Sequence, residues 1–148
     1  MIQIKLAQVF AWSFLWIFIP IVPVLAGTNE WTQLGTGITA SVNAIGRHPA
    51  QSQTLYAGTE NGFYFSANSG RAWELRGPSL VDRSVLCLAV DPVDGDRLYV
   101  GLNSGLSQSS DGGQTWSVAS GVGPGVLAVG TGAAGRVYAA TFGRGVFY

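Results

Sequence analysis

The stretch that decides the fold runs from Val85 to Trp116 and reads VLCLAVDPVDGDRLYVGLNSGLSQSSDGGQTW. A near copy lies 43 positions upstream, from Val42 to Trp73, and reads VNAIGRHPAQSQTLYAGTENGFYFSANSGRAW. The two copies agree without gaps at Val42/Val85, Pro49/Pro92, Leu55/Leu98, Tyr56/Tyr99, Gly58/Gly101, Ser66/Ser109, Gly70/Gly113 and Trp73/Trp116. A fixed period of roughly 20 to 50 residues is the signature of a repeat architecture.

Partial copies flank these two. The motifs LAV and RVY at 127–129 and 136–138 repeat the second copy with an offset of 39 residues. Upstream of the first copy, the residues WTQL at 31–34 match 73–75 and 116–118, the closing part of a repeat. The chain from residue 27 to residue 148 is therefore expected to be one repeat domain.

Within each copy the residues alternate in character over short runs that end in turn residues, which is the pattern of short strands. The predicted strands, by position within a copy, are 42–47, 85–90 and 126–129; 54–59, 97–101 and 136–141; 62–67, 105–109 and 145–148; and 31–34, 73–76 and 115–119. Four antiparallel strands per period are typical of a β-propeller blade. The sequence predicts an all-β fold of about three such blades in an incomplete or open ring, with repeats at about 42–76, 85–119 and 126–148 and an orphan closing strand at 31–34.

The turn before the last strand of the second copy carries a motif of the form S-x-D-x-G-x-T-W. Its residues are Ser109, Asp111, Gly113, Thr115 and Trp116, and a degenerate version in the first copy has Ser66, Asn68, Gly70 and Trp73. A short acceptor side chain can bond backbone N–H groups a few residues on and so hold such a turn. Asn in place of Asp keeps the acceptor and drops the charge, which indicates a structural role.

This motif resembles the Asp box, or BNR repeat, of sialidases, sortilin-type domains, xyloglucan hydrolases and photosystem II assembly factors. The resemblance covers roughly residues 31–148. It implies a β-propeller whose boxes lie at the blade edges, away from the central channel where ligands bind.

Residues 1–26 read MIQIKLAQVFAWSFLWIFIPIVPVLA, with Lys5 before an apolar run that ends at Ala26. A basic start, an apolar core and a small residue at the end are typical of a signal peptide cleaved after Ala26. The alternative is an uncleaved membrane anchor, because about 20 apolar residues suffice to span a bilayer as a helix. Under either interpretation this segment forms an N-terminal hydrophobic helix, and everything after Gly27 is exported.

Composition excludes two classes of protein. Lys plus Arg and Asp plus Glu each number 8, so the net charge is zero and a nucleic-acid partner is not expected. The single cysteine, Cys87, excludes an internal disulfide framework, and its apolar neighbours indicate a core residue.

No active site is expected. A glycosidase needs paired carboxylates, or in sialidases an arginine cluster with a tyrosine nucleophile. The exported carboxylates are Glu30, Glu60, Glu74, Asp82, Asp91, Asp94, Asp96 and Asp111, and most fall in predicted turns. Arg97 and Arg136 recur at one repeat position as exposed strand starts. The sequence therefore predicts no catalytic residue.

No metal or cofactor site is expected either. His48 aligns with Asp91 in a turn, and residues 91–96 lack the distal carboxylate of a calcium loop, so a solvated turn is expected. The glycines of 121–135 lack the Lys-Ser/Thr of a phosphate cradle. The aromatics Phe63, Tyr64, Phe65, Phe142, Phe147 and Tyr148 can form a carbohydrate or peptide surface, although strand packing is the commoner use.

Three blades do not make a propeller, since known rings have at least about four. The first interpretation is a fragment of a longer propeller. The second is self-assembly, in which the strand at 31–34 completes the third blade in the same chain or in a neighbour, and two chains close a ring of six blades. The predicted function is an exported, non-catalytic module that binds or scaffolds a protein or carbohydrate partner, including an assembly-factor role. The alternative is a fragment of an Asp-box glycoside hydrolase.

Overall fold

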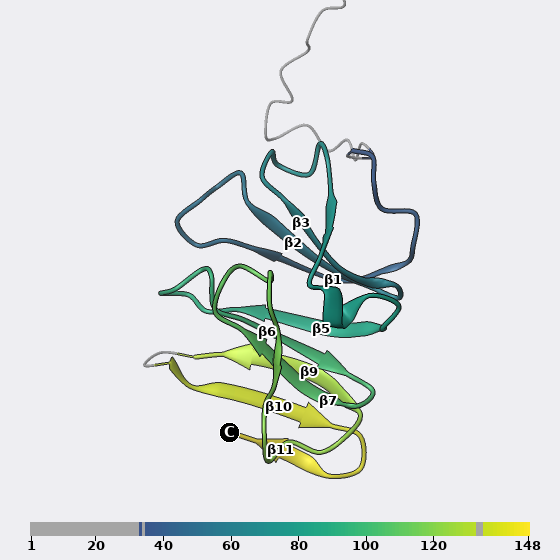
Figure 1. Cartoon of the computed structure of the whole chain (residues 1–148). Coiled ribbons are helices and arrows are strands. Elements are labelled where there is room, and N and C mark those ends of the chain that lie inside the picture. Colours follow the sequence, from purple (N-terminus) through teal and green to yellow (C-terminus); the bar gives the residue numbers. More distant parts are fainter. Residues whose placement is uncertain (1–32, 34, 133–134) are drawn as a thin grey trace, which may run out of the picture. The chain divides into compact units, whose positions relative to one another are not determined.

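The computed structural model describes residue 33, residues 35–132 and residues 135–148. The chain from Gln33 to Tyr148 forms one compact unit (Figure 1). Eleven strands and one short 3-10 helix are found in these residues: β1 (Val42–Arg47), β2 (Leu55–Thr59), β3 (Gly62–Ser66), β4 (Glu74–Arg76), η1 (Pro78–Leu80), β5 (Val85–Val90), β6 (Leu98–Leu102), β7 (Gly105–Ser109), β8 (Ser117–Val118), β9 (Val126–Thr131), β10 (Val137–Thr141) and β11 (Gly145–Phe147). No α-helix occurs in the described part of the chain, which confirms the all-β prediction.

The strands form three antiparallel sheets, each made of consecutive strands. The first has the order β1-β2-β3-β4, the second β5-β6-β7-β8, and the third β9-β10-β11. In the second hairpin of each sheet the turn is closed by glycine, as in the Thr59–Gly62 pair, where Gly62 has a φ of 138°. That conformation disfavours a Cβ, so the Asn-Gly sequence specifies the turn.

The same irregularity recurs in all three sheets. Asn43, Leu86 and Leu127 are each skipped in the pairing of the first strand with the second, which makes a β-bulge at the same repeat position. A bulge bends the strand and increases its twist. The repeat therefore extends beyond the side chains to the backbone geometry.

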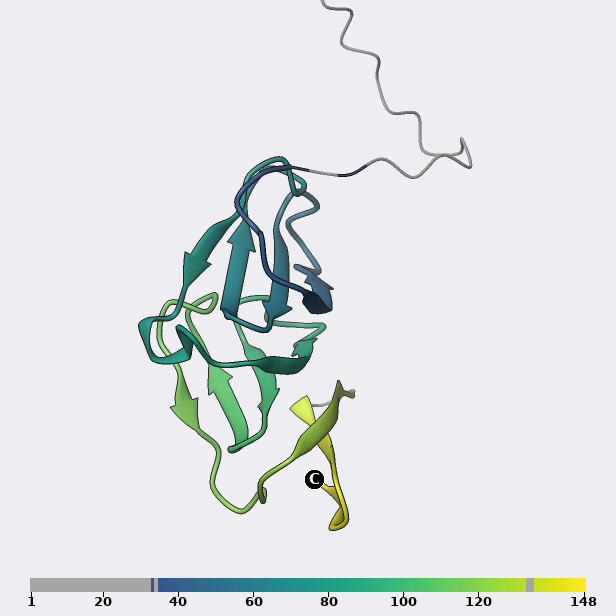
Figure 2. The same cartoon turned by 90° about the vertical axis from the view of Figure 1, so that its right-hand side faces the viewer.

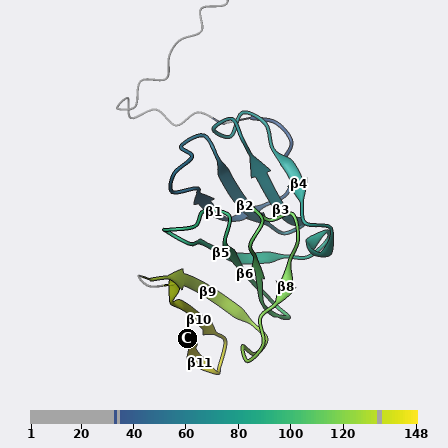
Figure 3. The ribbon, with the colours of Figure 1, turned by 60° about the vertical axis from the view of Figure 1, so that its left-hand side comes forward.

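The second sheet lies between the first and the third (Figures 1 and 2). Its first strand β5 contacts both β1 and β9, so the first strands of the three sheets follow one another, with β4 and β8 on the opposite side (Figure 3). Successive sheets packed face to face, with their first strands together, are the arrangement of β-propeller blades.

Two hydrophobic clusters fill the two interfaces between sheets. The cluster between the first and second sheets contains Tyr56, Phe63, Leu80, Val85, Leu98, Val100 and Leu102. The cluster between the second and third contains Tyr99, Leu106, Val126 and Ala139. Close approach depends on glycine, because a Cβ on Gly58 would lie 2.5 Å from a methyl carbon of Val85. The core therefore consists of contacts between blades.

The predicted strand positions hold, with shorter closing strands than expected. The closing strand of the second sheet is only Ser117–Val118, against a predicted 115–119, and the first strand of the third sheet extends to Thr131. The predicted closing strand at 31–34 and the N-terminal hydrophobic helix lie outside the described residues, apart from Gln33. Among the described residues there is no helical segment with the length and hydropathy that a membrane span requires.

Candidate functional site

The turn between β7 and β8, whose motif resembles an Asp box and which is called the second box below, is built on Ser109 and Asp111. The Ser109 hydroxyl donates to Asp111 Oδ1 over 2.8 Å and accepts from the backbone N–H of Gly113 over 3.0 Å. The Asp111 carboxylate in turn accepts from the backbone N–H of Thr115 over 2.9 Å and from the Thr115 hydroxyl. Side chains of the motif thus bind the groups that a sharp turn would otherwise leave without partners.

These hydrogen bonds change the acidity of Asp111. The Thr115 hydroxyl and backbone N–H, followed by the Ser109 hydroxyl, stabilise the ionised form and lower the pKa of Asp111 to about 2. The carboxyl group is therefore a fixed anion at neutral pH.

The degenerate box in the first sheet makes a smaller version of the same turn. Ser66 donates to Asn68 Oδ1 over 3.0 Å and accepts from the N–H of Gly70, while Asn68 Oδ1 accepts from the N–H of Ala72 over 2.9 Å. Ala72 stands where Thr115 stands in the second box, so the hydroxyl contact has no counterpart. Asparagine can replace aspartate here because every one of these bonds needs only a neutral acceptor oxygen.

The second box also connects two sheets. The Trp116 ring meets Phe63 of the first sheet edge-on, with centroids 4.9 Å apart, and its indole N–H donates to the Gly113 carbonyl over 3.0 Å. Gly113 has a φ of 84°, and a Cβ there would lie 2.3 Å from the Phe63 ring. The box thus holds its tryptophan and its glycine against the preceding blade.

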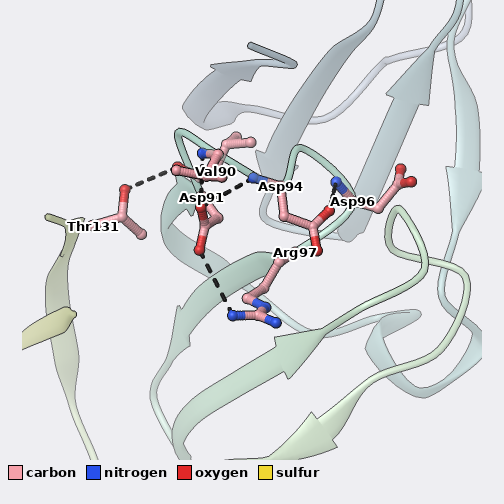
Figure 4. Close-up of polar contacts among 7 residues, drawn as sticks. Val90, Asp91, Asp94, Asp96, Arg97 and Thr131 are labelled. Atoms are coloured by element: carbon pink, nitrogen blue, oxygen red, sulfur yellow. Dashed lines mark hydrogen bonds and ion pairs between the residues drawn. The ribbon is translucent and has the colours of Figure 1, made fainter. Parts of the chain in front are cut away.

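A second polar cluster lies in the turn between β5 and β6 (Figure 4). Asp91 Oδ1 accepts from the N–H groups of Val93 and Asp94, over 2.8 and 3.1 Å, and Arg97 Nη1 lies 3.9 Å from Asp91 Oδ2. The backbone hydrogen bonds lower the pKa of Asp91, with a smaller contribution from Arg97. Contrary to the expected solvated turn, Asp91 is buried, whereas Asp94 and Asp96 are exposed.

His48 does in the first sheet what Asp91 does in the second. Its Nδ1 accepts from the N–H groups of Ala50 and Gln51, over 3.1 and 3.0 Å. The ring is buried against Gly95, where a Cβ would lie 2.3 Å from Nε2. His48 is therefore an acceptor that holds a turn, as its alignment with Asp91 predicts.

A hollow of about 400 Å³ lies beside the second box. Its lining combines hydroxyl, amide and guanidinium groups with two aromatic rings: Arg97, Tyr99, Gln108, Ser109, Ser110, Thr115, Trp116 and Ser117. Sequence reasoning gave Ser109, Thr115 and Trp116 a structural role and did not place Gln108 beside them. The signal available was the strand pairing, since Tyr99 pairs with Gln108 and Gln108 with Ser117.

The remaining candidates are dispersed. Cys87 is half-buried, and burial raises the pKa of its thiol, which keeps it protonated and unreactive. Phe142 and Tyr148 are exposed, whereas Phe63 is buried between sheets. In the described ranges no three His, Cys, Asp or Glu side chains gather in a way that could hold a metal ion.

No family model matches the chain, and no curated protein is similar to it in sequence. Solved structures are similar in fold. An ancestral GH74 enzyme matches with a TM-score of 0.64 and 20% identity over 77% of this chain, and the GH74 xyloglucanase from Xanthomonas campestris with 0.55 and 18% over 69%. YCF48 from Cyanidioschyzon merolae matches with a TM-score of 0.55 and 19% identity over 74%.

The chain spans only 18% of each of these GH74 enzymes and 36% of YCF48. Together with the three sheets, this likeness identifies the fold as a set of consecutive propeller-type blades. At these identities it shows the fold alone.

Proposed function

We propose that the chain is an exported, non-catalytic β-propeller module that binds or scaffolds a partner, as an assembly factor does. The observation that carries this proposal is that the buried and half-buried carboxylates are engaged in hydrogen bonds within the fold. Asp91 and Asp111 accept hydrogen bonds from their own turns, so they act as structural anions.

The acidity of these groups supports a non-catalytic role. A carboxyl group that serves as general acid in glycoside hydrolysis needs a raised pKa. The pKa values of Asp91 and Asp111 are both lowered by hydrogen bonds that favour the ionised form. Neither group is suited to donate a proton at neutral pH.

The hollow beside the second box is the proposed contact for the partner. Exposed hydroxyl and amide groups surround the half-buried Trp116, and the Arg97 side chain is 47% exposed while the paired Asp91 is buried. Such a surface offers hydrogen-bond donors and one available positive charge. It fits a polar protein segment or a carbohydrate that carries acceptor groups.

Site-specific photo-crosslinking tests this contact. A photoreactive residue is placed at exposed Ser110, which lines the hollow, and in a control at exposed Gln51 in a turn of the first sheet. We expect a discrete adduct from position 110 that is absent from position 51 and is lost in Arg97→Gln. Equal labelling from both positions contradicts the proposal.

The second candidate is a fragment of a glycoside hydrolase. It is favoured by the likeness to two GH74 enzymes, one of them a xyloglucanase. Incubation of the purified chain with xyloglucan, followed by measurement of reducing ends, separates the two functions. We expect no release above that of heat-denatured chain, and turnover lost in Asp91→Asn would establish the hydrolase instead.

Export is part of the proposal and rests on residues 1–26, with Lys5, the apolar run and Ala26. The mass of the chain recovered from the exported fraction tests it. We expect a chain that begins at Gly27. A chain that still begins at Met1 in the membrane fraction indicates the anchor, and recovery from the cytoplasm contradicts export.

A further inference from the structure

The two outer sheets each leave one face uncovered among the described residues, and the two faces differ in shape. Inside the protein, the first sheet presents Tyr56 and Phe63 to the second sheet, and the second presents Tyr99 and Leu106 to the third. By strand register, Tyr138 and Val146 occupy the same positions in the third sheet. Phe63 and Leu106 are 0% and 5% exposed, whereas Val146 is 69% exposed.

The first sheet has an open face on the side away from the second sheet. Val42, Val85 and Val126 are equivalent by register. Val85 and Val126 are fully buried against Gly58 and Gly101 of the preceding sheet, whereas Val42 is 52% exposed.

Around Val42 lies an apolar hollow of about 360 Å³ that also includes Ile45, Leu55 and Trp73. The equivalent residues of the second sheet, Leu88, Leu98 and Trp116, form the socket that Tyr56 and Phe63 fill. The first sheet thus carries the same socket without an occupant among the described residues.

The segment before β1, around Gly35, resembles the link around Gly77 that joins the first sheet to the second. Gly35 lies against Gly70, where a Cβ would be 2.0 Å from the Gly70 carbonyl oxygen. Gly77, 42 positions later, is part of the link from the first sheet to the second and has nearly the same φ, 76° against 75°; a Cβ there would lie 2.5 Å from the Trp116 indole nitrogen and 3.1 Å from the Gly113 carbonyl oxygen. The backbone around Gly35 is therefore shaped to follow another blade.

We propose that two copies of this chain join head to tail, the first sheet of each copy packing on the third sheet of the other, as a closed pair. Tyr138 and Val146 of one copy enter the socket around Val42 and Trp73 of its partner. The occupant is a second copy because the interface continues the two already present inside the chain. This inference goes beyond the proposed function and does not depend on it.

Closure follows from the number of sheets. The contact joins two different surfaces, so it closes into a ring or runs on as a filament. Known propellers have roughly four to eight blades. Twice the three sheets that the described residues form fall in this range, whereas the sheets of one copy or of three copies do not.

Position 140 differs from its equivalents at the internal interfaces, so the contact between copies must be slightly wider there. Ala140 stands where Gly58 and Gly101 stand, so Val42 of the partner cannot approach as closely as Val85 approaches Gly58. Val146 is smaller than Phe63 at the equivalent position, which leaves room for this shift. A Cβ built on Gly58 lies 3.1 Å from the Val85 Cβ, so a small outward shift brings positions 140 and 42 to about 3.5–4.5 Å, the separation that a disulfide prefers.

The first test is the mass of the full 148-residue chain in mild detergent, measured by light scattering coupled to size exclusion. We expect twice the mass of one chain. Val146→Asp and Val42→Asp change exposed side chains and should each give the mass of one chain with an unchanged β-sheet circular dichroism signal. Val93→Asp, at another exposed valine in the turn after β5, should remain a pair.

The second test reports the geometry. Ala140→Cys in one tagged copy and Val42→Cys in a differently tagged copy are co-expressed and oxidised. We expect a disulfide-linked species that carries both tags, and none when Val93→Cys replaces Val42→Cys. A single-chain mass for the unmodified protein, a filament of growing mass, or a pair whose mixed-tag sample does not cross-link overturns the proposal.

Discussion

At the scale of single residues, the side chains of the two boxes hold their turns through short-range hydrogen bonds. Asp111 accepts from Ser109 and from both the N–H and the hydroxyl of Thr115, whereas Asn68 accepts only from Ser66 and the N–H of Ala72. Charge-assisted hydrogen bonds are stronger than neutral ones. The second box is therefore the more tightly held of the two turns.

Alanine at these two acceptors should show this difference. We expect Asp111→Ala to lower the free energy of unfolding by about 2 kcal/mol and Asn68→Ala by about 1 kcal/mol, because each removes an acceptor from backbone donors of a turn. Urea unfolding followed by tryptophan fluorescence measures both. Equal losses would show that the charge and the Thr115 hydroxyl add nothing.

The lowered pKa of Asp111 also predicts a pH dependence. Its pKa in the folded chain is about 2, below its usual value of 3.8, so its ionised form stabilises the fold. This contribution is complete above about pH 5 and is lost as the pH falls toward 2. The stability advantage of the unmodified chain over Asp111→Asn should therefore shrink across that window, as urea midpoints at each pH would show. A constant difference contradicts the assignment.

Two glycines with similar backbone conformations should lose different amounts of stability when alanine replaces them. Gly113 and Gly143 have φ values of 84° and 72°, but a Cβ at Gly113 would lie 2.3 Å from Phe63 and one at Gly143 would meet nothing within 4 Å. We expect Gly143→Ala to destabilise by about 1 kcal/mol from the backbone alone. Gly113→Ala should cost at least about 2 kcal/mol more, since it also overpacks the interface. Thermal unfolding of both variants checks this, and similar losses would contradict it.

At the scale of the elements, each four-stranded sheet is a weak unit that is stabilised by its neighbour. β4 and β8 are only three and two residues long, and their residues are mostly exposed. Large side chains of each sheet pack against a neighbouring blade. Trp116 is the largest of them on the second sheet and packs against Phe63 of the first.

Truncation of the two equivalent tryptophans should therefore have unequal effects. We expect Trp116→Ala to cost about 3 kcal/mol, because it opens a cavity between two sheets. Trp73→Ala should cost about 1 kcal/mol, since Trp73 borders an open hollow. Both variants are best measured by urea unfolding in the Val146→Asp background, so that association of copies does not contribute. Equal costs would show that the interface does not depend on Trp116.

At the scale of the whole molecule, the second sheet is the centre of the described fold. Every residue of β6 is buried, whereas β1 on the first sheet and β11 on the third have mostly exposed residues. Sheets that are covered on both faces open only when the whole structure opens.

Native-state hydrogen exchange should follow this order. In the Val146→Asp variant we expect the slowest exchange in Leu98–Leu102, with faster exchange in Val42–Arg47 and in Gly145–Phe147, because the outer sheets are covered on one face only. Amide exchange read by mass spectrometry or NMR resolves these segments. Protection in β11 equal to that in β6 would contradict a gradient from the central sheet.

The sequence by itself determined the repeat, the hairpins and the box turns. These features depend on residues close together in the chain: the Asn61-Gly62 turn closes a hairpin, and Asp111 bonds groups two to four positions away. Short-range hydrogen bonds and the backbone freedom of glycine are set by local sequence, so their pattern could be predicted without coordinates.

Only the tertiary structure decided which faces are covered and which side chains line the hollow beside the second box. Arg97, Gln108 and Trp116 come from separate segments and meet only after the strands have paired, and Asp91 is buried although Val93 and Asp94 of the same turn are exposed. Tyr56, Tyr99 and Tyr138 are alike in sequence, yet only the first two are buried. The physical reason is that burial depends on the neighbouring blade, which a single repeat does not specify.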